Sequence, residues 1–317
     1  MKFLVTGGAG FIGSNIVEEL LKRGDEVSVI DNFSTGKREN LFPFEKDITL
    51  IEGDIRSYHI VQEAVKNVDV ILHQAALPSV PRSIKDPITT SEVNIGGTLN
   101  LLEAAIKADV KRFVYASSSS VYGDSPTLPK VETMMTNPMS PYAVTKLSGE
   151  KYCDVFSRIY GIETVCLRYF NVFGPRQDPG SQYSAVIPKF IRLMLNDRNP
   201  VIYGDGTQSR DFTYIANVVK ANILAATKEI DKSLTVNCAC NNQIDLVTLV
   251  SKLNTILGKS IEPYFENPRP GEVKHSFADI NLAKEKLGYK IEVGFDEGLE
   301  RTINSPINST NTIKPIV

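Results

Sequence analysis

Short apolar runs alternate with segments of helical apolar spacing through the first half of the chain. Runs that fit buried strands lie at residues 2–6, 26–30, 50–55, 68–73 and 112–116. Between them, residues 57–65 and 94–108 carry apolar positions at helical spacing. Strands that alternate with helices imply right-handed crossovers. The pattern therefore predicts an α/β fold with a doubly wound parallel sheet.

A glycine-rich turn follows the first predicted strand and opens the first predicted helix. Its glycines fit two registers, Gly8-x-Gly10-x-x-Gly13 and Gly7-x-x-Gly10-x-x-Gly13. The first glycine permits the tight turn, Gly10 lets the backbone approach phosphates, and Gly13 lets helix and strand pack closely. Free N–H groups at the helix start would meet a pyrophosphate in the positive field of the helix dipole. Because strand, turn and helix agree, the segment predicts a dinucleotide site.

Asp31 ends the second predicted strand, where a carboxylate would bind both ribose hydroxyls and repel a 2′-phosphate. This position favours NAD over NADP, although Lys37 and Arg38 could weaken the preference. Asp54 and Ile55 end the next strand, so we expect them beside the adenine.

Composition and charge exclude several classes of function. The chain has 317 residues, enough for one large domain with a smaller partner, and its net charge is −2. The chain has no block of five or more like charges, so we expect no nucleic-acid partner. No apolar run approaches the roughly 18 residues that span a bilayer, so we expect a cytoplasmic protein without a membrane segment. The three histidines are scattered, so we expect no metal site.

Residues 117–120 are four serines that leave the strand at 112–116, at the sheet edge where such folds bind ligands. A helix follows, with Ser140 as N-cap and Gly161 as its stop. Tyr142 and Lys146 are four residues apart and share one face of it. The helix dipole, the ammonium and a cationic nicotinamide would lower the pKa of Tyr142, so we expect a base usable near neutral pH.

Three segments resemble the extended short-chain dehydrogenase/reductase superfamily: residues 6–13, the region of Ser118, and residues 142–146. The resemblance extends to about residue 300. It implies a Rossmann domain that binds NAD, at residues 1–170 with a returning segment about 212–240. It also implies a smaller mixed α/β domain for a nucleotide sugar, at 171–211 and 241–317. Relatives pair as homodimers through a four-helix bundle that includes the Tyr142 helix.

The resemblance also assigns site residues. The catalytic set would be Ser118, Tyr142 and Lys146. The NAD would be tightly bound, regenerated in each turnover, and contacted by Gly7, Gly10, Phe11, Ile12, Gly13, Asp31, Asn32, Ser34, Thr35, Gly36, Asp54, Ile55, Gln74, Ala75, Ala76, Asn94, Tyr142, Lys146, Tyr169, Phe170 and Val172. The UDP-sugar substrate would be contacted by Ser79, Ser118, Ser119, Tyr142, Asn171, Ala185, Val186, Val201, Tyr203, Arg210, Arg269, Glu272 and Ser276.

Ser276 bears on which sugar is bound. It matches the position of a bulky tyrosine in epimerases confined to glucose and galactose sugars, and a serine leaves room for a 2-acetamido group. Residues 177–188 are also most similar to UDP-N-acetylglucosamine 4-epimerases. The resemblance therefore predicts NAD-dependent interconversion of UDP-N-acetylglucosamine and UDP-N-acetylgalactosamine through a 4-keto sugar.

Rival functions differ in the residues they require. Nucleotide-sugar 4,6-dehydratases carry an acid-base pair, usually Asp-Glu, where this chain has Ser119 and Ser120. UDP-glucuronate decarboxylases usually carry a glutamate in the same stretch, which is absent here. UDP-glucose and UDP-glucuronate 4-epimerases stay open, with Arg82 as the candidate cation for a uronate. A non-catalytic NAD-binding regulator would have a broken Ser/Tyr/Lys set, and all three residues are present.

Overall fold

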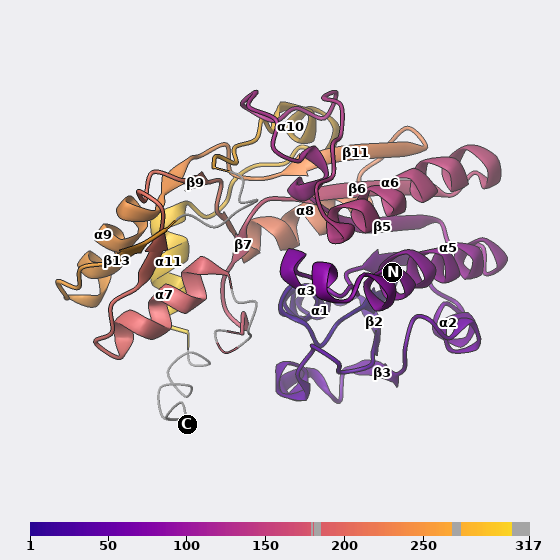
Figure 1. Ribbon diagram of the computed structural model, residues 1–317. Helices are drawn as coiled ribbons and strands as arrows, with labels where there is room; N and C mark the ends of the chain where they lie inside the picture. Colours follow the sequence, from indigo (N-terminus) through magenta and orange to yellow (C-terminus); the bar gives the residue numbers. More distant parts are fainter. Residues whose placement is uncertain (179, 181–184, 268–273, 306–317) are drawn as a thin grey trace.

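A parallel seven-stranded sheet forms the centre of the computed structural model, which describes residues 1–178, 180, 185–267 and 274–305 (Figure 1). Its strand order is β11-β6-β5-β4-β1-β2-β3, and every neighbouring pair is parallel. The strands are β1 (Lys2–Thr6), β2 (Glu26–Asp31), β3 (Ile48–Glu52), β4 (Val70–His73), β5 (Arg112–Ser118), β6 (Glu163–Tyr169) and β11 (Ser233–Cys238). The predicted doubly wound sheet is confirmed.

Helices cover both faces of the sheet (Figure 1). On one face α1 (Phe11–Lys22) packs beside α8 (Ile215–Thr227). On the other face α5 (Gly97–Lys107) packs between α2 (Tyr58–Ala64) and α6 (Pro141–Tyr160). Alternate strand residues enter two separate cores, so that Leu4 belongs to one and Phe3 to the other. Burial on both faces explains why these strands are nearly continuous apolar runs.

Local signals specify the ends of α6. The Ser140 hydroxyl accepts a hydrogen bond from the N–H of Ala143 at 3.2 Å, and Pro141 occupies the first turn. Gly161 ends the helix in a left-handed conformation, with φ of 79°. Both predicted cap residues are confirmed. They could be predicted from sequence because an N-cap and a left-handed helix end depend only on residues close in the chain.

Two other predicted elements differ from the observed ones. The strand expected over 50–55 is β3, which runs from Ile48 to Glu52, and the chain then turns at residues 55–56, where the Ser57 N–H bonds to the carbonyl of Asp54 at 2.9 Å. The helix expected over 94–108 is α5 preceded by a π-helical turn, η3 (Glu92–Gly96). Such turns are rare, and periodicity does not distinguish them from α-helix.

The chain after β6 builds a smaller group of elements, which lies on the left of Figure 1. Three two-stranded sheets pair β7 (Val172–Phe173) with β10 (Thr213–Tyr214), β9 (Ser209–Arg210) with β12 (Ile244–Asp245), and β8 (Val201–Tyr203) with β13 (Tyr264–Glu266). The helices of this group are α7 (Val186–Leu195), α9 (Leu246–Leu257) and α11 (Phe295–Ile303), whereas α10 (Asn281–Leu287) packs against β11 and α8 of the large sheet. The chain returns to the large sheet with α8 and β11. The predicted domain boundaries stay a prediction.

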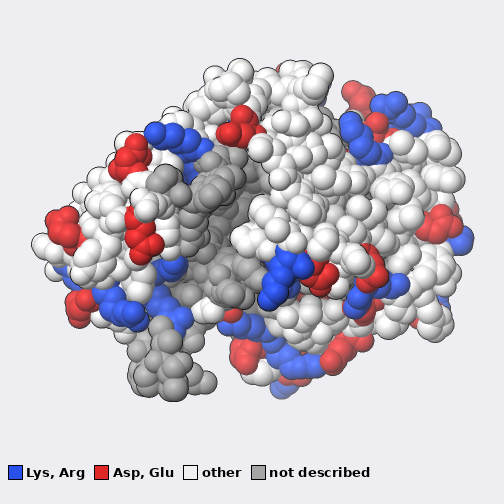
Figure 2. All heavy atoms as spheres, viewed as in Figure 1, with Lys and Arg blue, Asp and Glu red and all other residues white. Residues whose placement is uncertain are grey.

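Short helices complete the connections. They are η1 (Arg38–Asn40), η2 (Phe42–Phe44), α3 (Val80–Lys85), α4 (Pro87–Ser91) and η4 (Ser119–Tyr122). On the face shown in Figure 2, charged side chains of both signs are interspersed near the periphery. Within the described part of the chain, no helix has the length and apolar character that crossing a membrane requires.

Two glycines of the first turn should differ in what they contribute to folding. A Cβ on Gly13 would lie 2.2 Å from the carbonyl oxygen of Gly7, whereas a Cβ on Gly10 would meet only that oxygen, at 3.1 Å. We expect Gly13→Ala to destabilise the fold by about 1–3 kcal/mol, as overpacking does, and Gly10→Ala to cost much less. Thermal unfolding of both variants without added ligand checks this. Equal losses of stability would contradict it.

Candidate active site

The glycine-rich turn is tied to the end of β2. Gly7 has φ of +68°, and its N–H bonds to the carbonyl of Ile30 at 2.8 Å. The buried Asp31 carboxylate accepts hydrogen bonds from the N–H groups of Ala9 at 2.9 Å and Phe33 at 2.8 Å. Burial raises the pKa of Asp31, and the two hydrogen bonds oppose that shift. The acid predicted to bind the ribose therefore also holds the turn.

The space in front of α1 fits a dinucleotide diphosphate. No side chain caps Gly10 at the start of the helix, and a Cβ there would meet nothing but one oxygen of the same turn. Backbone N–H groups of a first helical turn bind anions well. The predicted NAD residues Asn32, Asp54 and Ala75 follow β2, β3 and β4 at the same sheet edge, and Asn32 donates to Asp54 at 2.9 Å. Ile55 and Phe170 are buried in the cores, which leaves their backbones for contact.

A buried hydrogen-bond chain supports the backbone after β4. Thr98 donates its hydroxyl proton to the carbonyl of Asn94 at 2.6 Å, so it accepts from Nε2 of His73 at 2.9 Å. Nδ1 of His73 then accepts from Thr6 at 2.7 Å, and the Thr6 oxygen accepts the Ala75 N–H at 3.1 Å. Burial lowers the pKa of His73 to about 3. The histidine is therefore a neutral connector, a role that sequence reasoning missed.

Ser118, Tyr142 and Lys146 come together where α6 packs on β5. Ser118 is the last residue of β5, and its side chain hydrogen-bonds that of Tyr142. The Lys146 ammonium is buried and donates to the carbonyl of Ala116 at 2.8 Å. It lies 5.9 Å from the ring centre of Tyr142 and 5.1 Å from that of Tyr115. A phenol, a hydroxyl and an ammonium thus share one side of the sheet edge.

The expected lowering of the Tyr142 pKa is wrong for the protein alone. Burial raises the pKa of Tyr142 to about 12, and the hydrogen bond with Ser118 lowers it only in part. Burial also lowers the pKa of Lys146 to about 8. The sequence argument placed the ammonium beside the phenol, whereas its hydrogen bond goes to a backbone carbonyl. Burial therefore outweighs the hydrogen bond with Ser118.

The π-helical turn positions Asn94 between two segments of the site. Its side chain bonds both the N–H of Leu77 at 2.8 Å and the carbonyl of Leu77 at 3.2 Å. The amide also donates to the hydroxyl of Thr145 on α6 at 3.0 Å. Ser79, two residues after Leu77, has φ of 97° and caps α3. Asn94 therefore joins the loop after β4 to the helix of Tyr142 and Lys146.

Gln74 and Tyr169 meet from neighbouring strand ends. The Gln74 amide donates to Asn222 on α8 at 3.0 Å. The Tyr169 hydroxyl lies 3.1 Å from Gln74 Oε1 and 2.8 Å from the Asn222 amide nitrogen. Burial raises the pKa of Tyr169, so its hydroxyl is neutral. This cluster fixes the surface beside the loop of Ala75 and Ala76.

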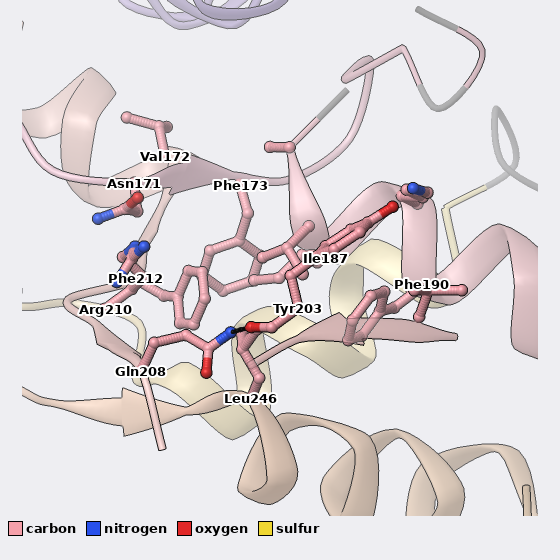
Figure 3. Close-up of a pocket in the computed structure, with 14 residues that line it drawn as sticks. Asn171, Val172, Phe173, Ile187, Phe190, Tyr203, Gln208, Arg210, Phe212 and Leu246 are labelled. Atoms are coloured by element: carbon pink, nitrogen blue, oxygen red, sulfur yellow. Dashed lines mark hydrogen bonds between the residues drawn. The ribbon is translucent and has the colours of Figure 1, made fainter. Parts of the chain in front are cut away.

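A second part of the site is a cavity of about 270 Å³ in the smaller group of elements (Figure 3). In Figure 3, Asn171 and Arg210 lie at one end and Phe190 at the other. Arg210 donates to the carbonyls of Ser209 at 2.9 Å and Lys274 at 3.0 Å. The predicted residues in its lining are Asn171, Val172, Ala185, Val186, Val201, Tyr203 and Arg210; sequence reasoning missed Phe173, Ile187, Lys189, Phe190, Gln208, Phe212 and Leu246.

The remaining predicted substrate residues are distributed as follows. Ser276 lies outside this lining, on a segment that pairs with β9 through its N–H and the Ser209 carbonyl at 3.0 Å. Ser119 begins η4 beside Ser118. Arg269 and Glu272 lie outside the described residues.

Comparison with known proteins agrees with this geometry. Residues 3–239 match the model of the NAD dependent epimerase/dehydratase family. A solved UDP-N-acetylglucosamine 4-epimerase from Methanobrevibacter ruminantium M1, in complex with UDP-N-acetylmuramic acid, is 42% identical with a TM-score of 0.91; the match covers 95% of this chain and 96% of that one.

Two further relatives are named for other sugars. A putative UDP-glucose 4-epimerase of Methanocaldococcus jannaschii is 39% identical over 98% of this chain and 99% of its own. A UDP-glucuronic acid 4-epimerase from Bacillus cereus, solved with UDP-glucuronic acid and NAD, is 37% identical with a TM-score of 0.89, over 96% of this chain and 98% of that one. The chain belongs to the NAD-dependent epimerase/dehydratase family, and its cofactor is NAD.

Proposed function

We propose that this chain is a UDP-sugar 4-epimerase that interconverts UDP-N-acetylglucosamine and UDP-N-acetylgalactosamine. The observation that carries the proposal is the meeting of Ser118, Tyr142 and Lys146 at the sheet edge that also holds the glycine-rich turn. The cavity with Asn171 and Arg210 at one end supports it, because a guanidinium and an amide suit a diphosphate.

Each residue has a chemical role in this proposal. Tyr142 takes the proton from the sugar O4 and later returns it, while Ser118 hydrogen-bonds the same oxygen. When bound, NAD supplies a hydride acceptor for C4 and a positive charge that favours the Tyr142 phenolate. Lys146, with its ammonium 5.9 Å from the ring centre of Tyr142, would hold the nicotinamide ribose. Arg210 and Asn171 would hold the diphosphate while the 4-keto sugar rotates. The hydride then returns to the opposite face of C4, and the product carries the inverted configuration at C4.

The residues beside Ser118 favour epimerisation over the dehydration also found in this family. Elimination of water requires an acid-base pair next to the catalytic hydroxyl, and Ser119 and Ser120 cannot ionise near neutral pH. A non-catalytic NAD-binding regulator is disfavoured, because the Ser/Tyr/Lys set is complete and the three side chains cluster.

Ser276 supports the N-acetylated sugar. Its segment is bonded to the strand that carries Arg210, so a small side chain there would leave room beside the anchored diphosphate. The relatives include UDP-N-acetylglucosamine, UDP-glucose and UDP-glucuronic acid epimerases, so their names favour none of the three. The second candidate is the uronate, because Arg82 lies on α3 only three residues from Ser79.

We also propose a homodimer through α6 and its neighbours. Val144, Val155 and Ile159 are exposed on the side of α6 opposite Tyr142 and Lys146. Ile84 on α3 and Ile88 on α4 are also exposed, and both helices pack against α6. An apolar surface of this kind is typical of an interface, and two copies facing each other here would bury it.

Tyr142→Phe should reduce 4-epimerisation by about a thousandfold, since general base catalysis contributes roughly 10²–10⁴. NAD should stay bound, because the phenylalanine keeps the ring. NMR of the UDP-sugar products and the NAD content of the purified protein measure both effects. Tyr160→Phe, on an exposed tyrosine of the same helix, is the matched control and should keep full activity. Near-normal turnover of Tyr142→Phe would remove Tyr142 from the mechanism.

Ser276→Tyr should lower kcat/KM for UDP-N-acetylglucosamine at least tenfold while sparing UDP-glucose, because the added ring fills the space for the acetamido group. Ser276→Ala keeps that space and should leave both activities. Product ratios with the four UDP sugars, read by NMR, check this. Equal loss on both sugars in Ser276→Tyr would show that the residue does not contact the 2-substituent.

Ile159→Glu should convert the proposed dimer to a monomer, because it inserts a charge into the apolar face of α6. Light scattering after size-exclusion chromatography measures the mass. Phe42→Glu, an equally exposed apolar residue in η2, should leave the mass unchanged. A dimer that persists in Ile159→Glu would show that the copies pair elsewhere, and a monomeric parent protein would exclude the dimer.

A further inference from the structure

A buried ion pair lies behind the proposed catalytic residues and has no role in the mechanism above. Glu150 is on α6, one helical turn beyond Lys146 and two beyond Tyr142, so all three face the sheet. Its partner Arg168 is on β6, and the side chains are only 5% and 6% exposed. Among ion pairs between described residues, no other buries both partners so fully.

The Glu150 carboxylate joins the helix to two strands. Arg168 binds it with both prongs of the guanidinium, Nε to Oε1 and Nη2 to Oε2, each at 2.8 Å. The Ser117 hydroxyl donates to Oε1 at 2.5 Å. Ser117 lies opposite Arg168 in the β5–β6 register and immediately precedes Ser118. The pair therefore links α6 to β5 and β6 directly beside Ser118, the proposed catalytic serine.

Arg168 also holds the turn that follows Ser118. Its guanidinium lies 4.7 Å from the ring centre of Tyr122, the last residue of η4. Its Nη1 donates to the carbonyl of Glu132 at 3.4 Å. The Tyr122 hydroxyl donates in turn to the side chain of Asn237 on β11 at 2.6 Å. The Arg168 guanidinium thus contacts Glu150 of α6 on one side and Tyr122 of η4 on the other.

Stability is a poor reason for such a pair. Removing two charges from water costs several kcal/mol for each ion, and well-packed apolar side chains of similar volume are often as stable or more stable. A bidentate pair does impose one geometry, because the planar guanidinium fork fits a carboxylate in a single orientation. Geometry at the site is therefore the better explanation of what the pair contributes.

We propose that Glu150 and Arg168 are positioning residues: their pair holds the α6 face of Tyr142 and Lys146 at a fixed distance from Ser118. This inference rests on the proposed roles of those three residues. It differs from a role in folding alone, because it requires that activity depend on the pair even when the fold is fully stable.

The decisive variant is the double substitution Glu150→Met with Arg168→Met. Methionine is unbranched, apolar and adapts to irregular buried space, so we expect thermal stability to be equal or higher. NADH binding, followed by its fluorescence, should be retained, and KM for the UDP sugar should change less than threefold. We expect kcat to fall about 10- to 100-fold, since a misplacement of about 1 Å costs roughly that much. A stable double variant with kcat within twofold of the parent would overturn the proposal.

The single variant Glu150→Gln adds a readout that a purely structural role would not move. Arg168 stays charged and loses its counter-charge, so positive potential near the site increases. The phenolate of Tyr142 is then favoured and its pKa falls, which moves the rising limb of kcat against pH to lower pH. The shift should be about one pH unit for a charge roughly 12 Å away, two helical turns, at an effective dielectric constant of about 20.

The surrounding groups keep this readout simple. Tyr115 on β5, Cys166 on β6 and Tyr122 on η4 face the pair, and all are neutral near pH 7. Burial raises the pKa of Tyr115, and that of Tyr122 to about 12, while the Cys153 thiol and burial raise that of Cys166. Glu132 is the nearby acid, and burial raises its pKa as well. On the Tyr142 side, His73 is neutral and Lys146 is present in every variant.

The same two strands provide a matched control. Arg112 and Glu163 pair at the opposite ends of β5 and β6, with Nε and Nη2 at 2.9 and 2.5 Å from Oε2. Glu163→Gln should leave kcat and the pH profile unchanged. If Glu150→Gln loses activity only in proportion to its folded fraction, with an unmoved profile, the pair is structural and the proposal fails. A parent protein that epimerises no UDP sugar would overturn the proposed function and this inference together.

Discussion

The site depends on one constraint, that all seven strands of the large sheet run parallel. Their carboxyl ends therefore meet at one edge, and the strand order reverses between β1 and β4. The glycine-rich turn after β1, Asp31 at the end of β2 and Ser118 at the end of β5 reach the same edge for that reason. Hydrogen bonds then join the strand ends, as when Asp31 holds the N–H of Ala9.

Burial at this edge determines the charge states of the site. His73 is neutral between two threonine hydroxyls, and Lys146 holds a backbone carbonyl with a pKa lowered to about 8. The same burial raises the pKa of Tyr142 to about 12. The tyrosine of the apoprotein is therefore a weak acid that needs added positive charge to lose its proton. A cationic cofactor provides such a charge, so proton transfer and cofactor binding are linked in the proposed mechanism.

The proposed function places binding and chemistry in different parts of the molecule. The cavity with Arg210 and Asn171 lies in the smaller group of elements, whereas the proposed catalytic residues lie at the edge of the large sheet. In the proposed mechanism an anchor at the diphosphate would let the sugar ring turn over, as a reaction that presents both faces of C4 to one cofactor requires. The ion pair of Glu150 and Arg168 would keep the catalytic side rigid during that motion.

The sequence by itself determined features that depend on neighbouring residues. The glycine turn, the N-cap at Ser140, the stop at Gly161 and the shared face of Tyr142 and Lys146 follow from local geometry. Tertiary structure decided the rest. The Tyr142 pKa depends on burial by distant elements, and Glu150 meets Arg168 only because β6 lies beside β5. The apolar lining of the cavity, which includes Phe173 and Leu246, comes from segments far apart in the chain, and no repeating pattern in the sequence relates them.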